Sequence, residues 1–537
     1  MAAPKKETPP SSAPATAKAQ VQLERASLPL YLQPAAPLLS AIARLPARIR
    51  TLLCLLVVSI LASCMYFVGN DQPPYPFWDE NYHMTSAQRY VEGLGHFEPH
   101  PPLGLLLIAA GESMSHANDA INKHQLVVDK YLEGDKLPAG FSFAGMRMMP
   151  SLFAAATALL FFGLMLSLTE NRLFALLFST LYLFENAYIV HFRAVHLDSF
   201  QMFFCVGLLW TFIHLWKRAA PLKWPHYVGM GALVALAMMV KVNAALFLVL
   251  FPLIYFKDAA SQTRPLIERP TDFLLKTGVT IVTIVAIFLA VFTVHVAIGH
   301  KMPDLATSAA RQDLENMSAP YREYLTQNQS ISPRIVVSAM SDYFKFMDKD
   351  HLGVPKLDIC KPGENGSHPL HWPVHDKTIN YRWDSADGKT SYVQLTGNQF
   401  SWFLGLAAVI YSLILIINHR LNKLPVDNAR TYHLIEVFTG IYIVFMALHL
   451  YLGTQRVMYL YHYFLGLLLT YVLLVLNWIY LSDLHKASLR QRIGTASLIA
   501  GCIIASCLFF LPLNNHWPLS KGQCEMRNVF MQIVECQ

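Results

Sequence analysis

The chain has 537 residues, of which 54% are hydrophobic and only 14% are charged, and its formal net charge is +7. Soluble globular chains carry about 25% charged residues, so this composition excludes an ordinary soluble enzyme. The apolar excess also excludes disorder of the whole chain. The basic residues are scattered between apolar runs, which argues against nucleic-acid binding. The composition therefore predicts an integral membrane protein.

Apolar runs recur along the chain at lengths close to the roughly 20 residues that a membrane-spanning helix needs. We expect about eleven spans, over 51–69, 150–168, 173–190, 199–216, 227–240, 244–256, 277–298, 400–418, 434–452, 457–480 and 495–513. The fifth and sixth of these windows are the shortest. A shorter apolar run at 103–110, after Pro101 and Pro102, is predicted to be a helix lying in the membrane interface. The expected fold class is an all-α polytopic membrane protein.

Polar segments divide these spans into regions. We expect a disordered cytosolic tail over 1–45, a membrane half over 46–298 with an exposed loop at 70–143, an exposed loop at 299–399, a four-span region at 400–513 and an exposed tail at 514–537. The short loops that are rich in Lys and Arg all fall on one side, which the positive-inside rule assigns to the cytosol. The N-terminus is then cytosolic, and the C-terminus and both long loops are extracytoplasmic.

Two cysteines, Cys524 and Cys536, lie close together in the final exposed segment. In an oxidising compartment they could close a small disulfide loop. Two free thiols in a flexible tail are an equally good interpretation, and the sequence leaves both open.

Charged and polar side chains gather near the extracytoplasmic ends of the expected spans. These residues are Asp79, Glu80, His100, Arg193, Asp198, Lys241 and Arg456. Transporters tend instead to place functional charges near the bilayer midplane. Carboxylates and cations at one membrane surface favour chemistry on a substrate with a lipid half and an anionic head.

Several motifs, taken in order, resemble the protein O-mannosyltransferase family of the GT-C glycosyltransferase superfamily. They are the Asp79-Glu80 pair, HPPLG at 100–104, ENAYIVHFRAVHLDSF at 185–200, VKVNAALF around Lys241, and SHPLHWP, GNQFSW and RVMYLYHYF near the C-terminal end. The resemblance implies a GT-C fold and a dolichyl- or polyprenyl-phosphate-mannose donor. It covers nearly the whole membrane part of the chain.

The chain also departs from the family pattern. Eukaryotic members carry a lectin-like MIR domain in the large loop, and the loop at 299–399 is short for that module. Leu105 stands where the family often has Lys. These differences resemble the bacterial branch, so we expect the bacterial inner membrane, with the endoplasmic reticulum membrane as the alternative.

An inverting transfer from a lipid phosphate needs a base for the acceptor hydroxyl and cations for the leaving phosphate. The resemblance implies that Asp79 is the catalytic base and that Glu80 assists it. Arg193, Lys241 and Arg456 are the candidates for the donor phosphate. Simpler roles compete with these, since acidic residues favour helix N-termini and long basic side chains extend toward lipid headgroups.

A second set of polar and aromatic residues could contact the sugar or the acceptor. These are His100, Asp198, His368, Trp372 and His462. The spacing of His368, His371 and His375 matches no closed metal site. We predict no metal and no other cofactor beyond the lipid-linked donor.

The main hypothesis is an inverting enzyme that moves mannose, or a related hexose, from polyprenyl phosphate to Ser or Thr hydroxyls of exported proteins. One alternative keeps the donor and changes the acceptor to lipid A, a cell-wall polymer or another glycan. Another is a transporter or flippase of a lipid-linked sugar. Expected partners are the polyprenyl lipid and acceptor polypeptides, without nucleic acid, and the sugar and the oligomeric state stay open.

Overall fold

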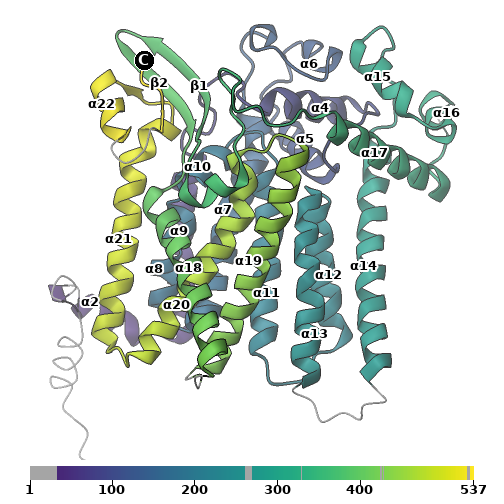
Figure 1. Cartoon of the computed structure of the whole chain (residues 1–537). Coiled ribbons are helices and arrows are strands. Elements are labelled where there is room, and N and C mark those ends of the chain that lie inside the picture. The colour runs from purple at the N-terminus through teal and green to yellow at the C-terminus, as the bar shows by residue number, and fades with distance from the viewer. Residues whose placement is uncertain are drawn as a thin grey trace, which may run out of the picture.

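The structure is a computed structural model that describes residues 29, 33–34, 36–260, 269–327, 329–423, 426, 428–528 and 533–537. Most of these residues are helical, and the long helices run side by side as a bundle (Figure 1). Most of the expected tail at 1–45 lies outside the described residues, and its last part contains the short helix α2 (Ala36–Ala43).

Within these ranges, nine helical segments are long and apolar enough to cross a membrane. They are α3 (Ala47–Phe67), α7 (Ala144–Thr169), α11 (Asp198–Lys217), η3 with α13 (Val242–Val249 and Leu250–Ala260), α14 (Arg269–Ile298), α18 (Gln399–Asn422), α19 (Ala429–Gln455), η6 with α20 (Leu460–Tyr463 and Phe464–Leu484) and α21 (Leu489–Asn514). Each of them overlaps one of the expected spans.

The two remaining expected spans take a different form. The third, at 173–190, is broken into α8 (Arg172–Phe178), α9 (Thr180–Leu183) and α10 (Asn186–Phe192), with a bend of 60° before α10. The fifth, at 227–240, is α12 (Trp224–Met238), whose 15 residues are fewer than the roughly 20 that a perpendicular crossing needs.

A buried carboxylate explains the break in the third segment. Glu185 precedes α10 and accepts a hydrogen bond from the Ala187 amide at 3.2 Å. The same carboxylate accepts from the Asn398 amide at 2.8 Å and from the Trp402 indole at 3.0 Å, both near the start of α18. Glu185 therefore satisfies the new helix N-terminus and ties it to α18, so the chain can bend inside the bundle.

The two long loops cover the same end of the bundle (Figure 1). The first contains α4 (Glu80–Glu92), α5 (Leu103–Ser115), α6 (Gln125–Val128) and η2 (Gly134–Lys136). The second contains α15 (Ser308–Asn316), α16 (Ala319–Gln327), α17 (Pro333–Gly353), η5 (Pro369–Val374), β1 (Ile379–Ala386) and β2 (Lys389–Leu395). An ion pair of 2.6 Å between Lys130 and Asp313 joins the two loops. The short apolar helix expected after Pro102 is α5.

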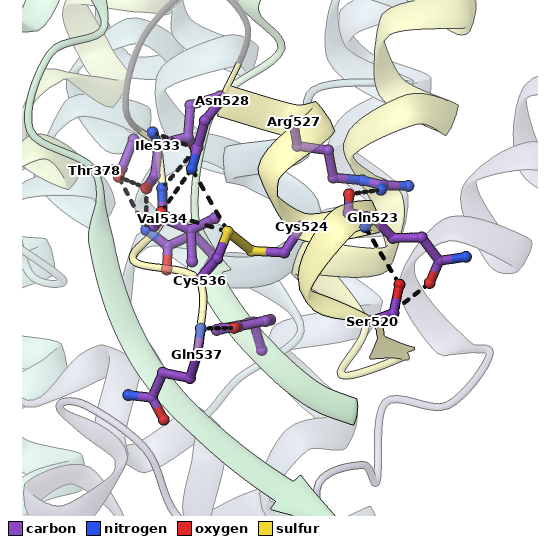
Figure 2. The surroundings of a disulfide bond; sticks show 12 residues. Thr378, Ser520, Gln523, Cys524, Arg527, Asn528, Ile533, Val534, Cys536 and Gln537 are labelled. Carbon is purple, nitrogen blue, oxygen red and sulfur yellow. Dashed lines mark hydrogen bonds between the residues drawn. A yellow bond between two sulfur atoms is a disulfide. The ribbon is translucent and has the colours of Figure 1, made fainter. Parts of the chain in front are cut away.

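A small sheet is the departure from an all-helical chain. Strands β1 and β2 form an antiparallel hairpin, and β3 (Pro518–Leu519) adds to β2. The tail continues through α22 (Lys521–Glu525) and η7 (Met526–Asn528). A disulfide joins Cys524 to Cys536 (Figure 2), which is the first of the two alternatives for these cysteines.

Candidate active site

Asp79 occupies the turn that enters α4, immediately after Trp78, whose backbone is in the left-handed region with φ 53°. One carboxylate oxygen of Asp79 accepts a hydrogen bond of 3.4 Å from the Tyr461 hydroxyl. Burial raises the pKa of Asp79 from 3.8 to about 6, although the nearby Lys241 opposes the shift. A carboxyl group whose pKa lies near neutrality is suited to take a proton from a hydroxyl.

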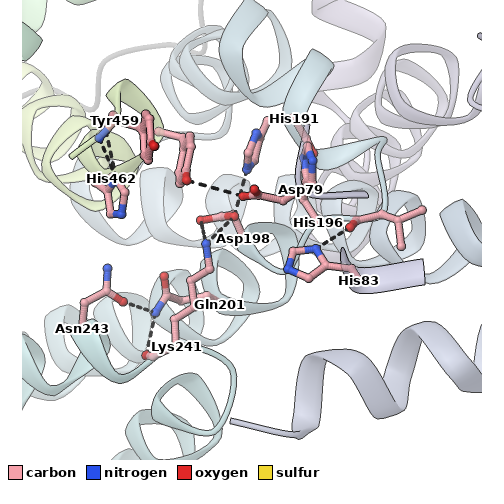
Figure 3. A network of polar contacts seen from close by, with 12 residues as sticks. Asp79, His83, His191, His196, Asp198, Gln201, Lys241, Asn243, Tyr459 and His462 are labelled. Carbon is pink, nitrogen blue, oxygen red and sulfur yellow. Dashed lines mark hydrogen bonds and ion pairs between the residues drawn. The ribbon is translucent and has the colours of Figure 1, made fainter. Parts of the chain in front are cut away.

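Asp198, Lys241 and His191 form a tight polar group next to Asp79 (Figure 3). The ammonium of Lys241 donates to both Asp198 oxygens, at 2.8 and 2.7 Å. The Nε2 atom of His191 lies 2.9 Å from Asp198 Oδ2, and its Nδ1 atom lies 2.7 Å from the Tyr381 hydroxyl. An ionised Asp198 can only accept, so Nε2 carries the proton and Nδ1 accepts from Tyr381.

The turn that carries Lys241 is held in place by α11. The side-chain amide of Gln201 donates to the Lys241 carbonyl at 2.9 Å and to Asn243 Oδ1 at 2.7 Å. Lys241 lies between α12 and η3, so the end of the short fifth segment delivers this cation to the site. Its ammonium is also 5.4 Å from the ring centre of Tyr461, which contacts Asp79.

Aromatic rings wall the site around Asp79. The Trp78 ring centre lies 5.1 Å from that of Tyr381 and 5.3 Å from that of Tyr459. Tyr461 stacks on His462 with centres 4.6 Å apart, and His462 stacks in turn on Trp372 at 6.3 Å. These faces offer the kind of surface that packs against a sugar ring.

Three histidines lie close together around the first turn of α4. His83, one turn along α4, has Nδ1 2.7 Å from the Val195 carbonyl. Its ring centre lies 6.2 Å from those of both His100 and His196. Burial lowers the pKa of His83 to about 4, so this ring is neutral at physiological pH. His100 therefore lies beside His83, which is in the first turn of α4.

Glu80 points away from this group. Its carboxylate is fully buried and pairs with Arg147, with two N–O distances of 2.8 Å. It also accepts from the Phe77 amide at 3.1 Å and from the Val195 amide at 2.7 Å. These four contacts tie the entrance of α4 to α7 and to the loop after α10, so Glu80 positions Asp79 from behind.

The structure does not bring Arg193 to the group around Asp79. Its guanidinium donates to the carbonyls of Val68 and Gly69 and to Asn515. Arg456 follows α19 at the same end of the bundle, beside His351, whose pKa is lowered by burial and then by the Arg456 charge. The charge of Arg456 also acts on the Tyr459 hydroxyl, so Arg456 is a second cation near the aromatic wall.

Two further predicted residues, Trp372 and His368, make contacts that hold η5 in place. Trp372 is fully buried in η5, and its indole donates to Ser367 Oγ at 2.9 Å. It supports His462 from behind the aromatic wall. His368 caps η5, where its Nδ1 accepts from the Leu370 amide at 3.4 Å. Within the described residues, no cluster of three or more His, Cys, Asp or Glu side chains could hold a metal.

Sequence reasoning missed several members of the site. His191 and His196 lie within seven residues of Asp198 in the same motif, and this closeness in sequence could have indicated that they belong to the site. His83 follows Asp79 by one helical turn, which places both on one face of α4. Tyr381 carries no such signal, because the hairpin that brings it to His191 belongs to the distant second loop.

Two family models match the chain. Residues 56–299 match the model described as dolichyl-phosphate-mannose-protein mannosyltransferase. Residues 356–533 match the model of the C-terminal four-span region of protein O-mannosyltransferase. Together the two matches cover most of the chain, including Asp79, Asp198, Lys241 and Arg456.

Among curated proteins, dolichyl-phosphate-mannose–protein mannosyltransferase 6 of Saccharomyces cerevisiae is 26% identical over 172 residues, which are 32% of this chain and 22% of that protein. Protein O-mannosyl-transferase 2 of Danio rerio is 26% identical over 153 residues, 28% of this chain and 19% of that protein. Each match therefore spans about a fifth of the relative's length.

Among solved structures, the protein O-mannosyltransferase Pmt1–Pmt2 complex of S. cerevisiae, bound to its sugar donor, has a similar fold. The TM-score is 0.75 at 14% identity, with 91% of this chain and 94% of that chain covered. This likeness extends the GT-C fold over nearly the whole molecule. With both family models matched in order along the sequence, the chain belongs to the protein O-mannosyltransferase family.

Proposed function

We propose that this protein is an inverting glycosyltransferase that moves mannose, or a related hexose, from a polyprenyl phosphate to Ser or Thr hydroxyls of exported polypeptides. The observation that carries the proposal is the placement of Asp79, whose pKa is about 6, beside Lys241 and Asp198. A base and a cation lie together there, as a single displacement at an anomeric carbon requires.

Asp79 takes the role of the base. It removes the proton of the acceptor hydroxyl, and the hydroxyl oxygen attacks the anomeric carbon from the face opposite the phosphate. The bond between that carbon and the phosphate oxygen breaks, and its electron pair leaves with the lipid phosphate. One carboxylate is sufficient for this step, whereas a retaining glycosidase needs two.

Lys241 and Arg456 take the role of neutralising the leaving phosphate. Two N–H groups of the Lys241 ammonium point to Asp198, which leaves a third for a phosphate oxygen. His191 and Asp198 position this ammonium. Arg456 has a buried Nε with no hydrogen-bond partner among the described residues, so it also has a donor available for an anion.

The proposed orientation places this site outside the cytosol. The end of the bundle covered by the two long loops is extracytoplasmic, the N-terminus is cytosolic and the C-terminus is outside. The disulfide between Cys524 and Cys536 is consistent with an oxidising compartment. The proposed membrane is the inner membrane of a bacterium, with the endoplasmic reticulum as the alternative.

The test uses the full-length protein, purified and reconstituted in liposomes with radiolabelled polyprenyl-phosphate-mannose. We expect label on a Ser/Thr-rich peptide and none on lipid A, and we expect Asp79→Asn to abolish it. Asp119→Asn, an exposed carboxylate of the same loop, is the matched control. Label on lipid A alone would identify lipid A as the acceptor. Movement of the lipid without any transfer, in both variants, would indicate a flippase and not an enzyme.

A further inference from the structure

A second pocket lies at the same end of the bundle, away from Asp79. Its volume is about 420 Å³, and it lies between the end of α3 and the end of α21. Helix α10 packs against both of these helices, and Arg193, the residue that follows its last turn, lines the pocket. The pocket is thus lined by one basic residue, Arg193, and by two membrane-spanning helices.

The guanidinium of Arg193 is buried without a carboxylate in direct contact among the described residues. The residue is 9% exposed, and its hydrogen bonds go to neutral acceptors, namely the Val68 and Gly69 carbonyls and the Asn515 side chain. Within the described residues it forms no ion pair. Burial lowers its pKa to about 10, so it stays charged at neutral pH.

A buried cation that lacks an anion is costly, because hydration is lost and no Coulomb attraction replaces it. Three of the five N–H groups of Arg193 are used by these contacts, which leaves donors for a ligand. Asp71 attracts the guanidinium from a distance but does not pair with it. The pocket therefore favours an anionic group.

The remaining lining indicates which anion fits. The walls include Met65, Val68 and Leu511, whereas Gln72 and His516 provide polar groups. The outer surfaces of α3 and α21 are apolar and exposed, with Leu52 at 63% and Leu508 at 56%. In a membrane protein such surfaces face lipid, so the pocket combines a hydrocarbon wall with a buried positive charge.

We propose that this pocket binds the phosphate of a membrane lipid, with Arg193 as the counter-ion and the lipid chain along Met65 and Leu511. The bound phosphate would neutralise the charge of Arg193 and link α3, α10 and α21. The site is separate from the donor site, because Arg193 contacts none of Asp79, Asp198 and Lys241. Its lipid is either an anionic phospholipid or a free polyprenyl phosphate, which share this chemistry.

Native mass spectrometry of the full-length protein in detergent tests the proposal. Phosphatidylglycerol, polyprenyl phosphate and zwitterionic phosphatidylcholine are titrated separately. We expect Arg193→Gln to weaken binding of at least one of the two anionic lipids about tenfold or more and to leave phosphatidylcholine unchanged. Arg334→Gln, an exposed cation on α17, should change none of the three.

A second variant keeps the cation and fills the pocket. Leu511→Trp should weaken binding of the same anionic lipid while Arg193 and its contacts remain. This variant therefore tests the proposal even if Arg193→Gln does not fold. Competition between the two anionic lipids then identifies the source of the phosphate. Unchanged anionic-lipid binding in folded Arg193→Gln, or in Leu511→Trp, overturns the proposal. Because binding is measured without transfer, this result is independent of the proposed enzymatic activity.

Discussion

Asp198 holds the ammonium of Lys241 with both of its carboxylate oxygens, at 2.8 and 2.7 Å, although the two residues are 43 positions apart. Asp198 begins α11 and Lys241 ends the turn after α12. Both side chains are nearly buried, so their pairing occurs in a medium that screens charge weakly. The pair places one positive charge at a defined point next to Asp79.

Asp79→Asn should abolish hexose transfer, by about 100-fold or more, because an amide cannot accept the proton of the acceptor hydroxyl. Initial rates of label transfer to a peptide measure this. The amide also removes a carboxylate that burial disfavours, so the midpoint of thermal unfolding should not fall. A variant that folds and transfers at more than a tenth of the wild-type rate would exclude Asp79 as the base.

The transfer rate should fall in acid. Burial raises the pKa of Asp79 to about 6, and only the deprotonated carboxylate can act as a base. We therefore expect kcat/KM for the acceptor to be constant above pH 7 and to drop about tenfold for each pH unit below 6. A profile that stays flat between pH 4.5 and 7 would contradict this assignment.

Lys241→Met should impair use of the donor more than use of the acceptor. The change removes the charge proposed to neutralise the lipid phosphate, and it leaves the Asp198 carboxylate with His191 as its partner. Kinetics at varied donor and varied acceptor separate the two effects. Lys301→Met, at an exposed lysine of the same end of the bundle, is the control. Equal losses for both substrates would count against a phosphate role.

Glu80→Gln should destabilise the fold. The carboxylate is fully buried against Arg147, and removing one partner of a buried ion pair costs about 3–5 kcal/mol. Thermal unfolding of the purified protein measures the loss. Glu133→Gln breaks the exposed pair with Lys136, where water screens the charges, and should lower the unfolding temperature far less. If the two variants unfolded at the same temperature, Glu80 would not hold the entrance of α4.

The disulfide should contribute to stability and not to catalysis. Cys524 and Cys536 enclose a loop with a sequence separation of 12 residues, and cross-links of that size stabilise by about 3 kcal/mol. The double variant Cys524→Ser, Cys536→Ser should unfold at a lower temperature and keep its transfer rate. The change Cys360→Ser, at an exposed free cysteine, is the control. A large loss of transfer in the double variant would link the tail to the site.

The sequence alone determined the class of fold and the acidic and basic residues that meet. Long apolar runs satisfy their backbone in a bilayer as helices, so these runs were enough to predict the nine long helical segments of the described residues, whereas the third expected span is broken and the fifth is short. Asp79, Asp198 and Lys241 were identified from their motifs. Their contacts could not be derived, because residue order does not specify how each helix is rotated in the bundle.

Tertiary structure decided which neighbouring residues take part. Glu80 follows Asp79 directly, yet the rotation of about 100° between adjacent residues of a helix points it at Arg147. Arg193 lies five residues before Asp198, yet the end of α10 directs it to Val68 and Asn515. Tyr381 reaches His191 only because a hairpin from the second loop folds over the site. Each outcome depends on packing between distant segments, which local sequence does not encode.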